Sequence, residues 1–550
     1  MNTLKYILLS VFVVSLIGCE NDALEDLKNR GAQEEAEPLE DFNQGSADFS
    51  TFVSLGNSLT AGFSDGALYK IAQKNSMPSI LAQQFAAVAN GGSFTQPLVN
   101  DNIGGLLAGG NPIPGFGPRL VFDGSGPAPL DSVVGPVQTT TDILTNNPSG
   151  PFNNLGVPGA KSFHLLAPNY GNVAALPNAN PYFIRMASSP GTTVIADAVA
   201  QQPSFISLWI GNNDVLGYAL SGGDGSNPIT PMAGQPGVGF EQTYAAIVQT
   251  LTGNIPEVQG ILCNIPNINA IPHFTTVPHD PLDPSDPNLA DQIPTLNAVF
   301  GGINQVFTAL GETERIIEFS TETSNPVVIH DENLADLSAQ ISGALSQSPE
   351  FAGLIQSFGL PAAAAPQVAQ LLGSTFGQAR QATENDLFVL PSSSVIGEVN
   401  TDRLSFLMSQ GFTEELAGQF SAEGLTLPLE DKWVLLPEEQ EEIATAVAEF
   451  NQVIETTASS YDFALLDANS LLNQIANTGF ESNNLILTSS LVTGGAFSLD
   501  GIHPTSRGYA LIANQMLKAI DVTYGSNFEA SGNLVDISTY KTNYSPTLLE

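Results

Sequence analysis

The sequence predicts an α/β protein built around a doubly wound, mainly parallel sheet. Short apolar runs typical of buried strands alternate along the chain with longer runs that carry helix signals, and this alternation is characteristic of that fold class. Two of the apolar runs end in Gly-Asn sequences, at Gly56 and Gly211, where the carboxyl edge of such a sheet would lie. The expected strands cover residues 49–55, 205–210, 260–265, 387–390 and 463–466.

The first expected strand and helix show how the elements are assigned. Residues 49–55 contain the threonine, valine and phenylalanine that strands favour, and the run breaks at Gly56. Ser76 and Pro78 then mark the start of a helix that continues to Val88, because serine caps helices and proline is tolerated in a first turn.

Two more helices are expected towards the C-terminus. Pro437 introduces a glutamate-rich first turn, and the helix continues as far as Ile454. A last helix, from about Thr505 to about Ile520, would close the sheet. Residues 526–550 are polar and weakly patterned, which predicts a C-terminal tail.

Two segments do not fit a minimal fold of this kind and are interpreted as insertions. Residues 91–151 are rich in glycine, proline and asparagine, whereas residues 274–385 are rich in alanine and glutamine and mostly helical in pattern. A chain of 550 residues has either two domains or one domain with insertions, and we predict one catalytic domain over residues 49–525. The first insertion is a candidate lid over the substrate cleft, or a surface loop without a function. The second insertion is a candidate partner-docking module.

The N-terminus has the pattern of a lipoprotein signal. Lys5 supplies a positive charge, residues 6–17 form an apolar run too short to span a bilayer, and a small residue precedes Cys19. The pattern predicts that residues 1–18 are removed as a signal peptide and that Cys19 then carries palmitate or a similar acyl group. The alternative is an ordinary secretory signal with a chance cysteine. Residues 19–48 would form an acidic flexible tether, and the chain would be anchored in a bacterial cell envelope.

Composition excludes several classes of partner and cofactor. The chain has 55 acidic and 15 basic residues and a net charge of −40, so it would repel nucleic acid, and no nucleic-acid partner is expected. Cys263 is the only cysteine besides Cys19, so an acylated Cys19 leaves no partner for an intrachain disulfide. The acidic residues are scattered and no metal-binding spacing of histidines or cysteines occurs, so neither a metal nor a cofactor is expected.

Two short motifs contain the residues that a serine nucleophile requires. Such a serine needs a sharp turn after a strand, a histidine to accept its proton and a carboxylate to orient the histidine. Ser58 follows the strand at residues 49–55 in the sequence GNSL. The sequence DGIHP places Asp500 three residues before His503, an offset at which a turn can bring the carboxylate to the imidazole Nδ1. Of the five histidines, only His503 has both this carboxylate and a helix start after it.

Two further motifs offer hydrogen-bond donors for a developing oxyanion. Asn213 lies in the sequence GNND after the strand at residues 205–210, at the sheet edge where open α/β folds bind ligands. Gly159 ends the sequence NLGVPG, and the backbone N–H of a residue without a Cβ lets a carbonyl oxygen approach closely. Either motif alone is also typical of an ordinary turn after a strand.

Together the four motifs resemble the SGNH hydrolase family, also called GDSL esterases or lipases, whose sequence blocks contain Ser, Gly, Asn and His in that order. The resemblance covers residues 49–214 and 463–520 and implies a flavodoxin-like three-layer α/β/α sandwich with a mainly parallel sheet and large insertions. The roles that it implies are Ser58 as nucleophile and oxyanion donor, Gly159 or Gly156 and Asn213 as further oxyanion donors, and Asp500 with His503 as the rest of the triad.

One position departs from the family pattern, and a nearby serine competes for the role of nucleophile. The family's aspartate before the serine is Asn57 here, whose carbonyl oxygen can still accept hydrogen bonds in the turn. Ser64, in the sequence GFSDG, matches the nucleophile elbow of α/β-hydrolases, but no strand pattern precedes it.

The expected function is hydrolysis of a carboxylic ester through an acyl-enzyme formed on Ser58. The substrate would be a lipid, an acetylated glycan or a small ester. The alternative is a non-catalytic surface lipoprotein that keeps the scaffold and binds a glycan or lipid, with Asn57 as the first sign of lost activity.

Overall fold

The computed structural model of the chain describes residues 39–550. The predicted signal peptide, Cys19 and the first part of the predicted tether lie outside the described residues. Within residues 39–550, no helix has both the length and the apolar content needed to cross a membrane. The described segment begins alongside the end of the last helix, where Ser46 donates its N–H to the carbonyl of Tyr524 at 2.8 Å.

The centre of the fold is a sheet of five parallel strands in the order β13-β8-β7-β1-β6. Gly56, at the end of β1, is in register with both Gly156 of β6 and Trp209 of β7, so the turns after these three strands meet at one edge of the sheet. The strands are β1 (Phe52–Gly56), β6 (Asn154–Gly156), β7 (Phe205–Trp209), β8 (Gln259–Cys263) and β13 (Ala464–Leu466).

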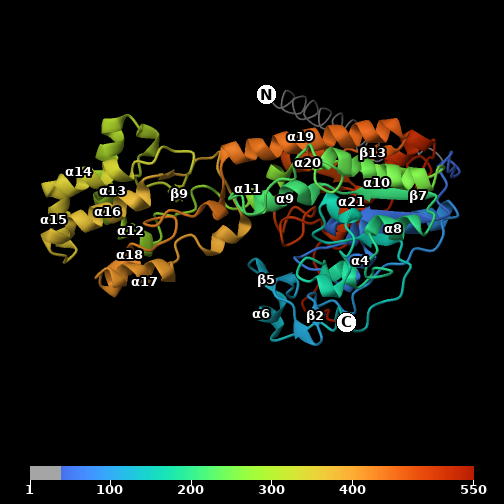
Figure 1. Cartoon of the computed structure of the whole chain (residues 1–550), viewed down its shortest axis with the longest axis horizontal. Helices are drawn as coiled ribbons and strands as arrows, with labels where there is room; N and C mark the ends of the chain where they lie inside the picture. Colours follow the sequence, from blue (N-terminus) through green and yellow to red (C-terminus); the bar gives the residue numbers. More distant parts are fainter. Residues whose placement is uncertain (1–38) are drawn as a thin grey trace, which may run out of the picture.

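Helices cover both faces of this sheet (Figure 1). Neighbouring strand residues such as Phe52 and Val53 belong to different hydrophobic cores, because successive side chains of a strand point to opposite faces. The core of Val53 includes side chains from α8 (Val194–Val199), α9 (Asn212–Leu220), α10 (Phe240–Asn254) and α19 (Pro437–Ser460). The core of Phe52 includes side chains from α5 (Met77–Val88), α20 (Ala468–Asn477) and α21 (Ser506–Tyr524). The predicted α/β class with a parallel sheet is therefore confirmed, and the arrangement is compatible with a three-layer fold.

One strand of the main sheet was not predicted, and one predicted strand was assigned to the wrong sheet. The edge strand β6 was not expected, because Asn154, Leu155 and Gly156 form no apolar run. Its extended conformation depends on its parallel pairing with β1. Residues 387–390 were expected to form a strand of the main sheet. Instead Leu387–Phe388 (β11) pairs antiparallel with Val434–Leu435 (β12), outside the main sheet.

A second hydrophobic core lies in a separate lobe built from residues 277–436 (Figure 1). Most of the predicted helical insertion belongs to this lobe, and α19 carries the chain back to the main sheet. Its helices are α12 (Pro287–Ala290), α13 (Ile293–Leu310), α14 (Ser338–Gln347), α15 (Pro349–Ser357), α16 (Ala365–Phe376), α17 (Thr401–Ser409) and α18 (Glu414–Gln419). Its other strands, β9 (Val328–His330) and β10 (Ala379–Gln381), form an antiparallel pair.

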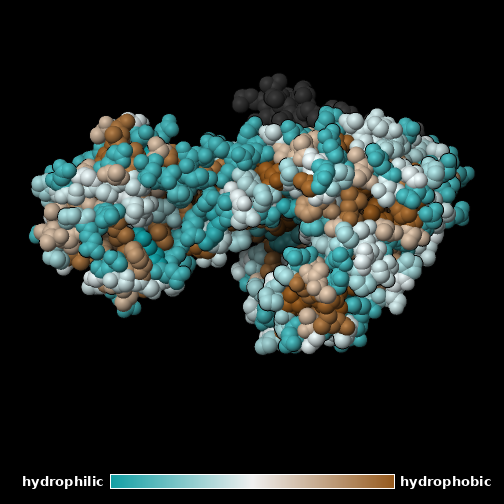
Figure 2. Space-filling view, viewed as in Figure 1, coloured by the Kyte–Doolittle hydropathy of each residue, from teal (hydrophilic) through white to brown (hydrophobic). Residues whose placement is uncertain are grey.

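A buried arginine in the first predicted insertion, residues 91–151, helps to hold this segment to the C-terminal residues. The guanidinium of Arg119 donates to the carbonyls of Asn102 and Ser545, each at 2.8 Å. Apolar side chains gather on the surface of this segment (Figure 2), and its exposed large apolar residues include Phe122 and Leu144. Its short elements are β2 (Leu107–Ala108), β3 (Asn111–Pro112), β4 (Leu120–Phe122), β5 (Pro127–Pro129) and α6 (Leu130–Val134).

The remaining short elements are α3 (Ser58–Ala61), α4 (Lys70–Lys74), α7 (Pro181–Ile184), α11 (Pro272–Thr275), β14 (Phe480–Ser482) and β15 (Leu485–Leu487).

Candidate active site

Ser58 lies in a tight turn between β1 and the short helix α3, of which it is the first residue. The turn requires glycine at position 56, because a Cβ there would lie 2.2 Å from Thr60 Oγ1 and 2.4 Å from the Trp209 carbonyl. This close packing places the Ser58 side chain at the carboxyl edge of the sheet, with 9% of the residue exposed.

Asn57 fixes the same turn through both ends of its amide. Its Oδ1 accepts the N–H of Leu59 at 3.0 Å, which caps α3, and its Nδ2 donates to Asn212 Oδ1 at 3.0 Å. In this arrangement an aspartate could accept the first bond but could not donate the second. Asn57 therefore caps α3 and links the turn after β1 to the turn after β7.

His503 bridges Ser58 and Asp500. Its Nε2 lies 2.9 Å from Ser58 Oγ, and its Nδ1 lies 2.8 Å from Asp500 Oδ2. The three predicted residues thus form one continuous hydrogen-bonded chain, in the geometry that a serine nucleophile, its base and an orienting carboxylate require. The imidazole side chain is 12% exposed, so it is shielded but reachable.

Asp500 is held as a carboxylate by several donors. Burial by itself would raise its pKa, but the charge and hydrogen bonds of His503 and the N–H of Ile502 hold that pKa well below its ordinary value. The N–H of Gly66 donates to Oδ2 at 2.8 Å, and the hydroxyl of Ser498 donates to Oδ1 at 3.0 Å. A carboxylate with these partners can hold the imidazole in the tautomer that leaves Nε2 free to accept a proton.

Three donors lie at the turns beside Ser58. Neither the Ser58 N–H nor the Gly159 N–H donates to any atom of residues 39–550. The Asn213 Nδ2 donates to the carbonyl of Ala160 at 2.9 Å, which places its amide beside Gly159 and leaves its second N–H free. The alternative donor, Gly156, already gives its N–H to the Asn154 side chain at 3.0 Å. The geometry therefore favours Gly159 over Gly156.

Asn213→Ala is expected to lower kcat by about 100- to 1000-fold with little change in KM, because an oxyanion donor acts on the transition state. Steady-state hydrolysis of a chromogenic ester measures both constants. Asn178→Ala, at an exposed asparagine, is the matched control and should keep wild-type turnover. Equal losses in the two variants would contradict an oxyanion role for Asn213.

The competing motif around Ser64 supports the turn that contains Asp500. Ser64 is buried, follows helix α3 rather than a strand, and donates its hydroxyl to the Pro504 carbonyl at 3.1 Å. Asp65 accepts the N–H of Leu499 at 3.1 Å, and burial raises the pKa of Asp65 to about 6. This supporting role could not be predicted from the motif, because the same residues also match a nucleophile elbow.

His273 is a second histidine at the site that sequence reasoning missed. Its N–H donates to the Gly501 carbonyl at 3.0 Å, and its Nδ1 lies 3.5 Å from the Asp500 carbonyl. Burial lowers the pKa of His273. Position 501 requires glycine, since φ there is +71° and a Cβ would lie 2.9 Å from the backbone nitrogen of His273. Helix α11 therefore packs against the turn that contains Asp500 and His503 and stabilises it.

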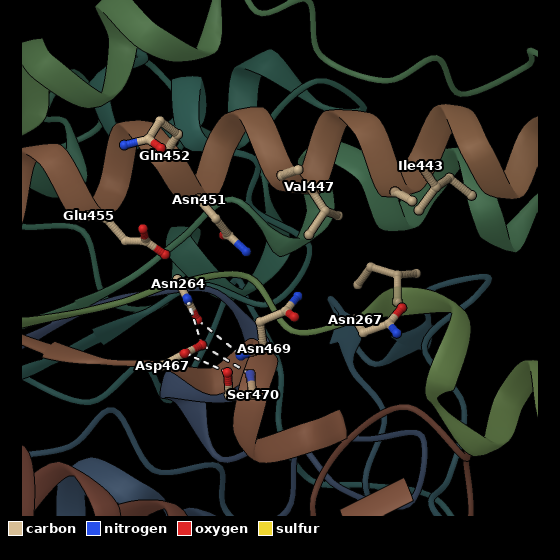
Figure 3. Close-up of a pocket in the computed structure, with 13 residues that line it drawn as sticks. Asn264, Asn267, Ile443, Val447, Asn451, Gln452, Glu455, Asp467, Asn469 and Ser470 are labelled. Atoms are coloured by element: carbon tan, nitrogen blue, oxygen red, sulfur yellow. Dashed lines mark hydrogen bonds between the residues drawn. The ribbon is translucent and has the colours of Figure 1, made fainter. Parts of the chain in front are cut away.

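A polar pocket of about 430 Å³ at the other end of the sheet edge does not include the triad. Figure 3 shows Asn264, Asp467 and Ser470 close together below α19, with the side chain of Asn451 extending from that helix into the pocket. Asn264 Nδ2 donates to Asp467 Oδ1 at 2.9 Å, and Asn451 exchanges two hydrogen bonds with the backbone of Ile265. The hydrogen-bonding groups of these residues pair with one another and connect the ends of β8 and β13 to α19 and α20.

Comparison with protein-family models, with curated proteins and with solved structures finds no match to this chain, so its resemblance to SGNH hydrolases rests on the four sequence motifs.

Proposed function

We propose that the chain is a serine ester hydrolase of the SGNH type. The observation that carries this proposal is the unbroken hydrogen-bonded chain from Ser58 Oγ through His503 to Asp500. The Ser58 and Gly159 N–H groups and the second N–H of the Asn213 amide add unused donors beside the serine. Acyl transfer needs this combination of an activated hydroxyl and nearby donors.

The strand order supports the flavodoxin-like architecture that the family resemblance implies. Numbered along the chain, the five strands lie in the order 2-1-3-4-5 across the sheet, which is the flavodoxin-like order. Folds with this order bind ligands between their first and third strands, where the winding direction reverses. Those strands are β1 and β7 here, and Ser58 and Asn213 lie just after them.

In the proposed reaction, His503 Nε2 takes the proton of Ser58 while Oγ attacks the ester carbonyl. The carbonyl oxygen becomes an oxyanion that accepts hydrogen bonds from Ser58 N–H, Gly159 N–H and Asn213. The C–O bond to the alcohol then breaks, and His503 gives the proton to the departing alcohol. Water activated by His503 next attacks the acyl-enzyme, which releases the acid and regenerates Ser58.

A groove that no triad residue lines, but that reaches Thr276 three residues after His273, supports an ester with an apolar part. It has a volume of about 630 Å³ and lies between Pro127 of the β4–β5 hairpin and the second lobe, where Figure 2 shows a hollow. Leu390 and Leu491 are among its lining residues. Thr276 also lines it and directly follows α11, the helix that places His273 against the turn of Asp500. Lipid, acetylated glycan and small ester remain the proposed substrate classes.

The test of this proposal is covalent labelling by a fluorophosphonate probe. The probe reacts with a serine only when a neighbouring base activates it, so the purified chain should be labelled stoichiometrically and a heat-unfolded sample should not. Absence of labelling in folded protein would favour the alternative, a non-catalytic protein that binds a glycan or lipid on this scaffold.

Anchoring in a bacterial cell envelope through an acylated Cys19 is also a proposal, supported by the sequence pattern before that cysteine. Cys19→Ser is expected to move the protein out of the membrane fraction or to leave it unprocessed, because acylation needs the thiol. Fractionation with and without detergent measures this. Wild-type protein that is freely soluble without detergent would contradict the anchor.

A further inference from the structure

Three carboxylates that the proposed reaction does not use converge where the two lobes meet. Glu332 follows β9, Asp431 begins a short helical turn (Asp431–Trp433), and Glu439 lies in the first turn of α19. One oxygen from each lies within 4.8 Å of the others. Trp433 packs against both the sheet core and the second core, so this cluster lies at the junction of the lobes.

Two oxygens of this cluster are buried without a hydrogen-bond donor. Glu439 is only 4% exposed, and its Oε2 accepts the Leu436 N–H at 2.6 Å, which caps α19. Its other oxygen, Oε1, has no donor among the described residues, and the same holds for Asp431 Oδ1. Both carboxylates lie within hydrogen-bonding range of Glu332, so either a shared proton or a cation must hold these acidic groups together. A buried carboxylate oxygen normally has a donor or a cation, because burial removes it from water.

The surroundings of the cluster are also acidic. Burial first, and then the neighbouring acidic groups, raise the pKa values of both Asp431 and Glu439. The nearby basic side chains are already engaged, since Lys432 pairs with Glu430 and Arg380 pairs with Asp331 and Asp386. Within the described residues, no lysine or arginine forms an ion pair with any of the three carboxylates.

We propose that Glu332, Asp431 and Glu439 bind a calcium ion that joins the two lobes. Calcium prefers oxygen ligands, and its bonds of about 2.3–2.6 Å let ligands on opposite sides lie about 5 Å apart, which suits this cluster. Magnesium demands shorter bonds in a stricter octahedron and should bind more weakly. The sequence predicted no metal, because Glu332 is distant along the chain from Asp431 and Glu439 and only the fold brings the three together. The site does not depend on the proposed ester hydrolysis.

Calorimetric titration of the purified, EDTA-treated chain with CaCl₂ tests the site. The wild type should bind one equivalent, and calcium should raise its thermal unfolding temperature. Loss of a residue that only contacts a metal ligand typically costs about 10- to 100-fold in metal affinity. Glu439→Gln removes a direct ligand, so it should weaken calcium binding by about 100-fold or more. The glutamine Oε1 can still accept the Leu436 N–H, so the cap of α19 is kept.

Glu438→Gln is the matched control, because it removes the same charge from an exposed neighbour and should bind calcium like the wild type. Should Glu439→Gln fold poorly, Glu332→Gln at the exposed ligand tests the same site and should also weaken binding. No saturable binding by the wild type at millimolar CaCl₂, or equal affinity in Glu439→Gln and Glu438→Gln, would overturn the proposal.

Discussion

Ser58→Ala is expected to lower kcat by about 10⁴- to 10⁶-fold and to abolish fluorophosphonate labelling. Ser58 Oγ is the hydroxyl that lies 2.9 Å from His503 Nε2, and alanine has no atom that could form the acyl-enzyme. The hydroxyl makes no other hydrogen bond in the described chain, so its loss should leave the fold and its unfolding temperature nearly unchanged. Turnover of a chromogenic ester, gel detection of the probe and circular dichroism measure the three quantities.

Ser64→Ala is the matched control for this variant. Its hydroxyl donates to the Pro504 carbonyl rather than to a histidine, so the variant should lose some stability but keep its labelling. The opposite result, in which labelling persists in Ser58→Ala and vanishes in Ser64→Ala, would move the nucleophile to the α/β-hydrolase elbow. The oxyanion roles proposed for Gly159 and Asn213 would then fall as well.

The fold could be predicted from sequence where local signals and tertiary packing agree. The buried strands β1, β7, β8 and β13 are apolar runs, and the helices α5 and α19 begin at a proline or next to one. These strands and helices were therefore predicted close to their true positions. β6 was missed because its place in the sheet depends on pairing with β1 rather than on its own residues. Likewise, the sequence of β11 indicates a strand but not which strand it will pair with.

The candidate site was predictable only where its residues are close to strand ends or to each other. Ser58 and Asn213 follow strands of one sheet, and Asp500 and His503 share one turn, so short motifs were enough to find them. Asp65 and His273 support the same turn from distant parts of the chain. No spacing rule links such residues, because only the completed fold brings them together.

Asp500→Asn is expected to lower kcat by about 10⁴-fold, through the wrong tautomer of His503. Oδ1 accepts the N–H groups of Ile502 and His503, so an asparagine should keep its carbonyl oxygen at that position. Its NH₂ group would then replace Oδ2 and donate to His503 Nδ1. The ring proton would move to Nε2, which could no longer accept the proton of Ser58. KM should change little, because the substrate does not contact Asp500 in the proposed mechanism.

His503→Ala should be at least as damaging as Asp500→Asn, because it removes the base itself. The double variant should be barely worse than His503→Ala, since a carboxylate that acts by orienting an imidazole has no function once the imidazole is gone. Turnover of the two single variants and the double variant on one ester forms the thermodynamic cycle that measures this. Asp500 also accepts N–H groups from Gly66 and Ile502, so unfolding temperatures of all three variants separate lost stability from lost catalysis. Losses in kcat that multiply independently would show that Asp500 does not act through His503, and the proposed triad would have to be abandoned.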